Sequence, residues 1–146
     1  MSVLHLCDEE PAVVRPETSV ADAIHLMLSK RVGAVGVVDT NSVVAGIFTE
    51  RDVLRKVALS GRDPATIQVR EVMSTPVVLA TPGTTPGEAL AVMVDRHFRH
   101  LPVVDERGKL LGMLSIRNLL QAQVDELTQQ LDSMEHYVTN DSPGGD

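Results

Sequence analysis

A threonine and an aspartate in the first half of the chain form the motif best suited to binding a ligand. Thr49 and Asp52 are three residues apart at the predicted start of a helix. An ionised carboxylate can accept hydrogen bonds from two hydroxyls of a ligand, and the N-terminus of a helix favours an anion. Thr-x-x-Asp is also the spacing of a helix-capping box, so a purely structural role is the alternative interpretation.

Other reactive side chains do not form a pattern typical of catalysis. We find no Ser-His-Asp or Cys-His arrangement, no glycine-rich phosphate loop and no cluster of metal ligands. Cys7 is the single cysteine, which excludes an internal disulfide, and His5 and Cys7 have no further ligands at zinc-site spacing. We therefore predict that the protein is not an enzyme and has no metal and no catalytic cofactor.

Composition limits the protein to a small number of classes. The chain has 146 residues, 43% of them apolar, with no Trp, one Tyr and two Phe, so its core must be aliphatic. A net charge of −7 argues against nucleic acid as the main partner, because phosphate binding needs a basic surface. The sequence shows neither a signal-peptide pattern nor an apolar run long enough to span a membrane. We expect a cytoplasmic protein without a membrane partner.

An internal repeat organises the chain. When the sequence is aligned with itself at an offset of 66 residues, the register holds without a gap from Pro16 to Leu120. Such a register indicates a duplication. Identical pairs include Pro16 with Pro82, Ala23 with Ala89, Met27 with Met93, Val37-Val38-Asp39 with Val103-Val104-Asp105, and Gly46 with Gly112.

Each copy has the same predicted order: strand, helix, strand, strand, helix. Ser19 and Thr85 each precede an acid by three residues, which is the spacing of a capping box, and Pro86 suits a first helical position. Polar turns at 39–42 and 105–108 predict two hairpins. The predicted strands are 12–14, 35–38 and 43–48 in the first copy and 77–80, 101–104 and 110–114 in the second, with second helices beginning near Glu50 and Ile116.

The duplicated pattern resembles the CBS domain pair, or Bateman module, over about residues 5–125. The motifs are His100–Asp105 followed by Gly112–Asn118, and Val35–Asp39 followed by Gly46–Asp52. The resemblance implies an α+β fold of two intertwined repeats related by a pseudo-two-fold axis. We divide the chain into repeat 1 at 5–60, a linker at 61–72, repeat 2 at 73–125, a C-terminal helix extension at 126–139 and a disordered tail at 140–146.

The resemblance also implies a cleft that holds an adenosine derivative: AMP, ADP, ATP or S-adenosylmethionine. By the family pattern, Thr49 and Asp52 bind the ribose. Arg99 and His100 face the phosphate, which such a pair can hold by charge-assisted hydrogen bonds with a pH dependence near neutrality. The alternative is that Arg99 and His100 are solvated residues at the start of a strand. The adenine slot is formed by Met73, Val78 and Phe98.

A second, weaker cleft is implied by the same symmetry. Its ribose motif pairs Ser115 with Asn118 where the family has an aspartate, and its phosphate positions, Gly33 and Ala34, provide no cation. Arg117 is a substitute cation. Its adenine slot would be formed by Cys7, Ala12 and Val32. We expect this cleft to be empty or to bind weakly.

Beyond the repeats, apolar residues continue with the spacing of a heptad seam, which indicates an assembly element. The alternative is a helix that folds back on its own module. We expect a homodimeric regulatory module that responds to an adenine nucleotide and acts on an unidentified downstream protein. The other hypothesis is a dimeric adaptor that binds no ligand. The seam residues are Leu120, Val124, Leu127, Leu131, Met134 and Val138.

Overall fold

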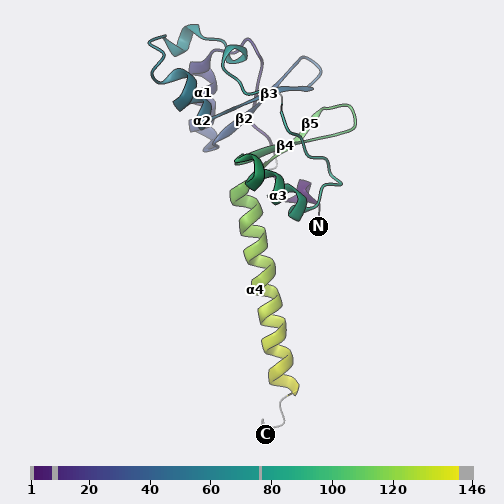
Figure 1. Ribbon diagram of the computed structural model, residues 1–146. Helices are drawn as coiled ribbons and strands as arrows, with labels where there is room; N and C mark the ends of the chain where they lie inside the picture. Colours follow the sequence, from purple (N-terminus) through teal and green to yellow (C-terminus); the bar gives the residue numbers. More distant parts are fainter. Residues whose placement is uncertain (1, 8–9, 76, 142–146) are drawn as a thin grey trace.

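The computed structural model describes residues 2–7, 10–75 and 77–141 and confirms the α+β class (Figure 1). The order predicted for each copy is present, apart from the first strand of the second copy. The strands are β1 (Val13–Val14), β2 (Ala34–Val38), β3 (Val44–Thr49), β4 (His100–Val104) and β5 (Leu110–Ser115). The helices are α1 (Val20–Lys30), α2 (Glu50–Asp52), α3 (Pro86–Arg96) and α4 (Ile116–Asp141), and the short helical segments are η1 (Val3–Leu6), the π-helical η2 (Val53–Val57), η3 (Pro64–Thr66) and η4 (Val69–Glu71).

The first strand expected at 77–80 is reduced to one parallel bridge. The N–H of Ala80 donates to the carbonyl of Pro102 at 2.8 Å, and its carbonyl accepts from Val104 at 2.9 Å. Pro82, two residues further on, has no N–H to extend this ladder. In the first repeat, β1 pairs in parallel with β2 over two residues, and β2 pairs antiparallel with β3.

The predicted turns and helix starts form by local hydrogen bonds. Asp39 Oδ1 accepts from the N–H of Asn41 at 2.8 Å, and Asp105 Oδ1 accepts from the N–H of Arg107 at 2.8 Å. Ser42 and Gly108, which are equivalent, both adopt left-handed backbone angles, with φ of 65° and 82°. The hydroxyls of Ser19 and Thr85 accept from the N–H of Asp22 and Glu88, each at 3.1 Å, and so cap α1 and α3.

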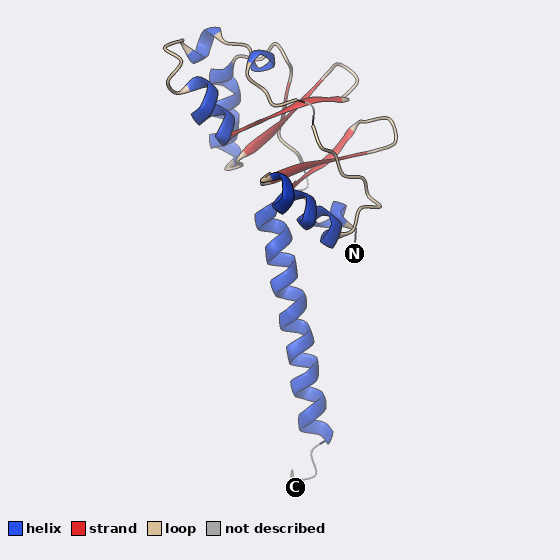
Figure 2. Cartoon of the chain, in the orientation of Figure 1, coloured by secondary structure: helices blue, strands red, loops and turns tan. Residues whose placement is uncertain are grey.

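A pseudo-two-fold axis relates the two hairpins. Val43 and Lys109 are equivalent residues, 66 positions apart, and they face each other in an antiparallel bridge. On either side, Val44 donates to the carbonyl of Gly108 and Leu110 to that of Ser42, both at 3.1 Å. A residue can pair in this way with its own equivalent when the symmetry axis passes between the two. Figure 2 shows the strands of both repeats between α1–α2 on one side and α3 with the start of α4 on the other.

The segment that precedes each repeat packs into the core of the other repeat. Val3 of η1 is fully buried in the second repeat's core, beside Met93 and Leu114. Val69, its equivalent in the segment expected to be a linker, is fully buried in the first repeat's core. Val69 also donates to the carbonyl of Thr18 at 2.8 Å. This exchange intertwines the repeats and fixes their relative position.

Helix α4 begins in the second core and then projects away from the module (Figure 1). Leu119 is fully buried, but Leu127 and Leu131 are 58% and 64% exposed, so the helix does not fold back on its own module. The side chain of Val138 and residues 142–146 lie outside what the structure describes. Among the described helices, none combines the length and the apolar character that a membrane span needs.

Candidate functional site

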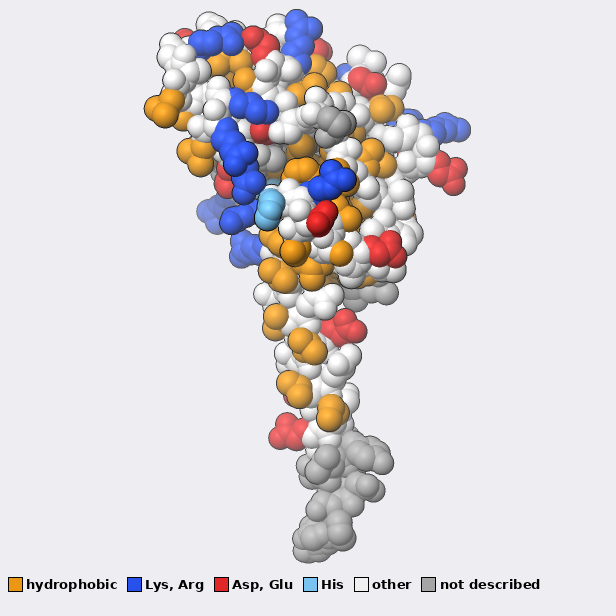
Figure 3. Space-filling view, viewed as in Figure 1, with side chains coloured by type: hydrophobic (Ala, Val, Ile, Leu, Met, Phe, Trp, Pro, Cys, Tyr) orange, Lys and Arg blue, Asp and Glu red, His pale blue; other side chains and the backbone are white. Residues whose placement is uncertain are grey.

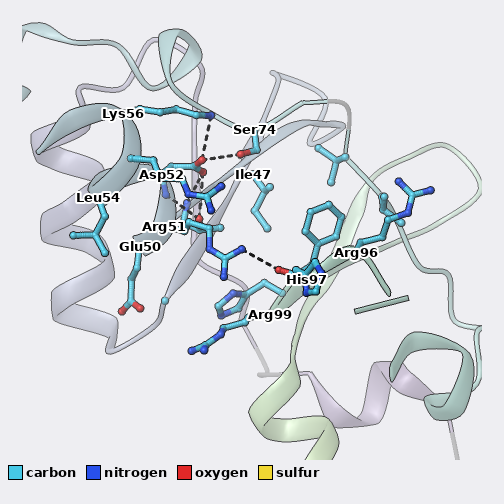
Figure 4. Close-up of a pocket in the computed structure, with 17 residues that line it drawn as sticks. Ile47, Glu50, Arg51, Asp52, Leu54, Lys56, Ser74, Arg96, His97 and Arg99 are labelled. Carbon is cyan, nitrogen blue, oxygen red and sulfur yellow. Dashed lines mark hydrogen bonds and ion pairs between the residues drawn. The ribbon is translucent and has the colours of Figure 1, made fainter. Parts of the chain in front are cut away.

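A cavity of about 830 Å³ lies where the two repeats meet (Figure 4). One wall comes from β3, α2 and η2 of the first repeat, and the other comes from the end of α3 and the start of β4. The predicted residues Thr49, Asp52, Val78, Phe98, Arg99 and His100 all line it. Met73 packs instead against the first core, where its sulfur lies 2.6 Å from the place that a Cβ on Gly46 would occupy.

Asp52 lines this cavity and is only 4% exposed. Its Oδ2 accepts from the N–H of Thr49 at 3.0 Å, and its own N–H donates to Thr49 Oγ1 at 3.3 Å, so both halves of a capping box are present. The structural role considered from the sequence is therefore real. Its other oxygen, Oδ1, accepts from the hydroxyl of Ser74 at 2.7 Å. Both carboxylate oxygens are thus engaged by protein groups.

Lys56 is a partner of Asp52 that the sequence analysis missed. Its Nζ lies 3.2 Å from Asp52 Oδ1, and the same ammonium donates to the carbonyl of Val72 at 3.0 Å and to that of Met73 at 3.5 Å. The i, i+4 spacing of Asp52 and Lys56 is a sequence signal for such a pair. Lys56 thereby connects the candidate acceptor to the segment that leads into the second repeat.

His100 is half-buried at the start of β4, beside Arg99. Burial lowers the pKa of the imidazole below its usual value of 6.5, and Arg99 lowers it further, whereas Glu50 opposes the shift. A Cβ on Gly33 would lie 3.2 Å from His100 Cε1, so the glycine leaves room for the ring. His100 is therefore mainly neutral at pH 7 when the cavity holds no anion.

The cavity contains more cations than the sequence analysis named. Arg51, Arg55 and Arg96 line it together with Lys56 and Arg99. Arg51 reaches across the cleft, where its Nη1 donates to the carbonyl of His97 at 3.1 Å (Figure 4). In Figure 3, Lys and Arg side chains gather beside a histidine on the body of the molecule, whereas α4 presents apolar and acidic side chains. The i, i+4 spacing of Arg51 and Arg55 was an available sequence signal.

The residues predicted for the second cleft lie in different environments. Ser115 caps the start of α4, where its Oγ accepts from the N–H of Asn118 at 3.0 Å, and Arg117 is exposed. Ala12 belongs to the first core, and Val32 packs against the same core. Cys7 contacts the position where Gly112 would carry a side chain, with its Cβ 2.8 Å away. Asn118 occupies the position equivalent to Asp52, so this half of the symmetric pair has no carboxylate there.

Comparison with protein families matches residues 3–59 and 69–125 to the CBS domain. An uncharacterised protein of Methanopyrus kandleri is 33% identical over 74% of this chain, and an uncharacterised 17.7 kDa protein of Acidianus ambivalens is 38% identical over 81%. The chain spans 55% and 70% of the lengths of these two relatives.

Solved structures match most of the chain. A putative signal-transduction protein with CBS domains from Burkholderia ambifaria gives a TM-score of 0.77 at 37% identity, over 84% of this chain and 91% of that one. CBSX2 of Arabidopsis thaliana, solved in complex with AMP, gives 0.74 at 29% identity, over 85% and 97%. A CBS domain pair solved with 5-methylthioadenosine and S-adenosyl-L-methionine gives 0.78 at 17% identity, over 86% and 98%, a likeness of fold alone.

Proposed function

The chain belongs to the CBS domain family, and on this premise we propose that it is a regulatory module that binds an adenosine nucleotide between its two repeats and passes the bound state to a partner protein. One observation carries the proposal. A buried carboxylate from the first repeat and an aromatic, a guanidinium and an imidazole from the second line the same cavity: Asp52, Phe98, Arg99 and His100.

Each part of the ligand has a matching group. Asp52 accepts the ribose hydroxyls, because an ionised carboxylate can accept two hydrogen bonds at once. The adenine packs against Phe98 and Val78, since a ring face favours a flat base. Arg99 and His100 face the phosphate. CBSX2, a relative of 29% identity, was solved with AMP, which supports a ligand of this class.

Ligand binding at Asp52 would change contacts elsewhere in the module. Ribose hydroxyls compete with Lys56 and Ser74 for the oxygens of Asp52. A displaced Lys56 also loses its hydrogen bonds to the carbonyls of Val72 and Met73. Because these two residues pack in the first core and lead into the second repeat, binding loosens the hold of the first repeat on the segment that joins it to the second.

The second candidate, an adaptor without a ligand, is favoured by the exposed apolar stripe on α4. We propose that a second copy of the chain covers it, through pairing of two α4 helices. The positions next to the seam are mostly neutral, with Gln121, Gln123, Thr128 and Gln130 beside it. The acids Asp125, Glu126 and Asp132 fall on the outer face, whereas Glu135 lies next to the seam. In a parallel pair of identical helices, Glu135 of one copy would face the neutral Gln130 of the other, so like charges do not meet there.

A ligand screen by thermal unfolding separates the two candidates. AMP, ADP, ATP and adenosine are added to the full chain, with guanosine as the control nucleoside. A ligand at a hundredfold excess over its dissociation constant stabilises the folded state by about 2.7 kcal/mol. We expect adenosine compounds, and not guanosine, to raise the unfolding temperature. If no adenosine compound does so, the adaptor hypothesis replaces the sensor.

A further inference from the structure

The cavity concentrates positive charge in a protein that is acidic overall. The net charge of the chain is −7, and it contains 13 Lys and Arg residues. Five of them line this cavity, against two acids, Glu50 and Asp52. The excess of cations is local, because α4 carries Asp125, Glu126, Asp132 and Glu135 with no Lys or Arg after Arg117. A local basic cavity on an acidic protein selects small anions rather than a nucleic acid, which needs an extended basic surface.

Most of these cations have no carboxylate partner within the described part of the chain. Lys56 is paired with Asp52, at 3.2 Å. Arg51 donates to a neutral carbonyl, and Arg96 reaches Asp95 only at 3.9 Å in an exposed contact. Arg55 and Arg99 form no ion pair with any described residue. Four guanidiniums therefore share one cavity with little internal compensation, and an anionic ligand would reduce their mutual repulsion.

The four arginines come from both walls. Arg51 and Arg55 are one turn apart on α2 and η2 of the first repeat, and η2 is a π-helical segment, a form often found at functional sites. Arg96 ends α3 and Arg99 precedes β4 in the second repeat. Figure 4 shows Arg51 and Arg99 near each other, whereas the side chain of Arg96 lies further away and extends away from both. A chain of phosphates between the walls would meet guanidiniums from both repeats, and guanidinium is the side chain best matched to phosphate oxygens.

Resting on the proposed function, we infer that the ligand of this cavity is an adenosine di- or triphosphate rather than AMP or S-adenosylmethionine. Arg99 and His100 hold the first phosphate, and Arg51, Arg55 and Arg96 hold the outer ones. The cavity of about 830 Å³ lies towards the upper end of small-molecule sites, about 300–1,000 Å³, so it has room for the longer ligand. The sulfonium of S-adenosylmethionine would place a positive charge among the arginines, which disfavours it.

The test measures the affinities of ATP, ADP, AMP, adenosine and S-adenosylmethionine for the full chain by calorimetry, without divalent metal and at two salt concentrations. We expect ATP to bind about tenfold or more tightly than AMP, because each added charge-assisted contact is worth about that factor. The affinity of ATP should fall more steeply with salt than that of AMP, and S-adenosylmethionine should bind more weakly than adenosine.

A matched pair of variants locates the outer phosphates. R55A/R96A removes two cavity arginines, and R70A/R107A removes two exposed arginines that lie outside the cavity. We expect the ratio of ATP to AMP affinity to fall about tenfold in R55A/R96A and to stay within about twofold in R70A/R107A. Circular dichroism confirms that each variant is folded.

The outcomes separate this inference from the function on which it rests. If adenosine and AMP bind but ATP binds no more tightly than AMP, the inference is overturned and the proposed function stands. An unchanged ATP to AMP ratio in R55A/R96A overturns the assignment of Arg55 and Arg96. If no adenosine compound binds, both the inference and the proposed function are overturned.

Discussion

The ammonium of Lys56 lies 3.2 Å from Oδ1 of Asp52, the carboxylate proposed to accept the ribose. The side chain of Asp52 is 5% exposed and that of Lys56 is 40% exposed, so the carboxylate is buried while the ammonium remains accessible to solvent. A ligand that uses Asp52 must compete with Lys56. The pair therefore contributes to the stability of the unliganded protein and lowers its affinity for a nucleoside.

Replacing Lys56 with methionine tests this competition. K56M leaves Asp52 buried without its cation, so we expect the free energy of unfolding to fall by about 1–2 kcal/mol, less than for a fully buried pair because Lys56 is partly solvated. Adenosine affinity should rise, because its hydroxyls no longer displace an ammonium. Chemical denaturation and calorimetry measure the two effects, and K30M, at an exposed lysine of α1, is the control. Weaker adenosine binding in K56M would contradict the competition.

Replacing Asp52 with asparagine tests the ribose contact. D52N keeps the shape of the side chain but removes the charge and one acceptor, so we expect adenosine affinity to fall about tenfold or more. The parent should also bind adenosine more tightly than 2′,3′-dideoxyadenosine, and D52N should lose this preference. D125N, on the outer face of α4, is the control with the same chemical change. A preference for adenosine that survives in D52N would show that the ribose lies elsewhere.

The lowered pKa of His100 makes two pH effects predictable. In the unfolded chain the imidazole titrates near 6.5, and in the folded chain it titrates lower. Between these two values the unfolded state binds more protons, so His100 makes the free energy of unfolding fall as pH decreases through this window, and it has no such effect above the window. H100Q should flatten this part of the stability curve. H25Q, at an exposed histidine of α1, should leave it unchanged.

The affinity for a nucleotide should change with pH in the opposite direction to the stability: it should rise as pH falls. A bound phosphate stabilises the imidazolium, so binding takes up a proton and the parent gains affinity for AMP, relative to H100Q, as pH falls below 6.5. The parent and H100Q are compared with the same ligand because the phosphate itself titrates near pH 6. From the sequence alone, we expected His100 to titrate near neutrality. Its burial beside Arg99 moves the titration of the unliganded protein to lower pH. A parent-to-H100Q affinity ratio that is constant from pH 5 to pH 8 would contradict the contact.

Assembly through α4 is tested by sedimentation. We expect the full chain to form a dimer, and L127Q/L131Q to dissociate at least tenfold more readily, because the two leucines supply apolar area at the seam at about 25 cal/mol per Å². D125A/D132A changes only the outer face and should leave the dimer intact. A chain that ends at Gln123 lacks most of the seam and tests the opposite possibility. If it dimerises as tightly as the full chain, the module alone forms the dimer and α4 contributes nothing to it.

The sequence by itself determined the repeat and, apart from the strand expected at 77–80, the order of the elements. These depend on local spacing. Ser19 and Thr85 cap helices because their acids follow three residues later, and Asp39 and Asp105 shape turns with their own backbone. The offset of 66 residues put Thr49 and Asp52 in one copy and Arg99 and His100 in the other, and the resemblance to the CBS pair implied that the two sets face one cleft.

Only the tertiary structure decided which groups meet across the cleft and how the repeats hold together. Lys56 and Ser74 converge on Asp52 from segments 18 residues apart, and Arg51 reaches His97 across 46 residues. Val3 and Val69 are unremarkable apolar residues in sequence, yet each is buried in the opposite repeat. Such contacts depend on how the two sheets pack, because packing brings together side chains whose local sequence carries no information about one another.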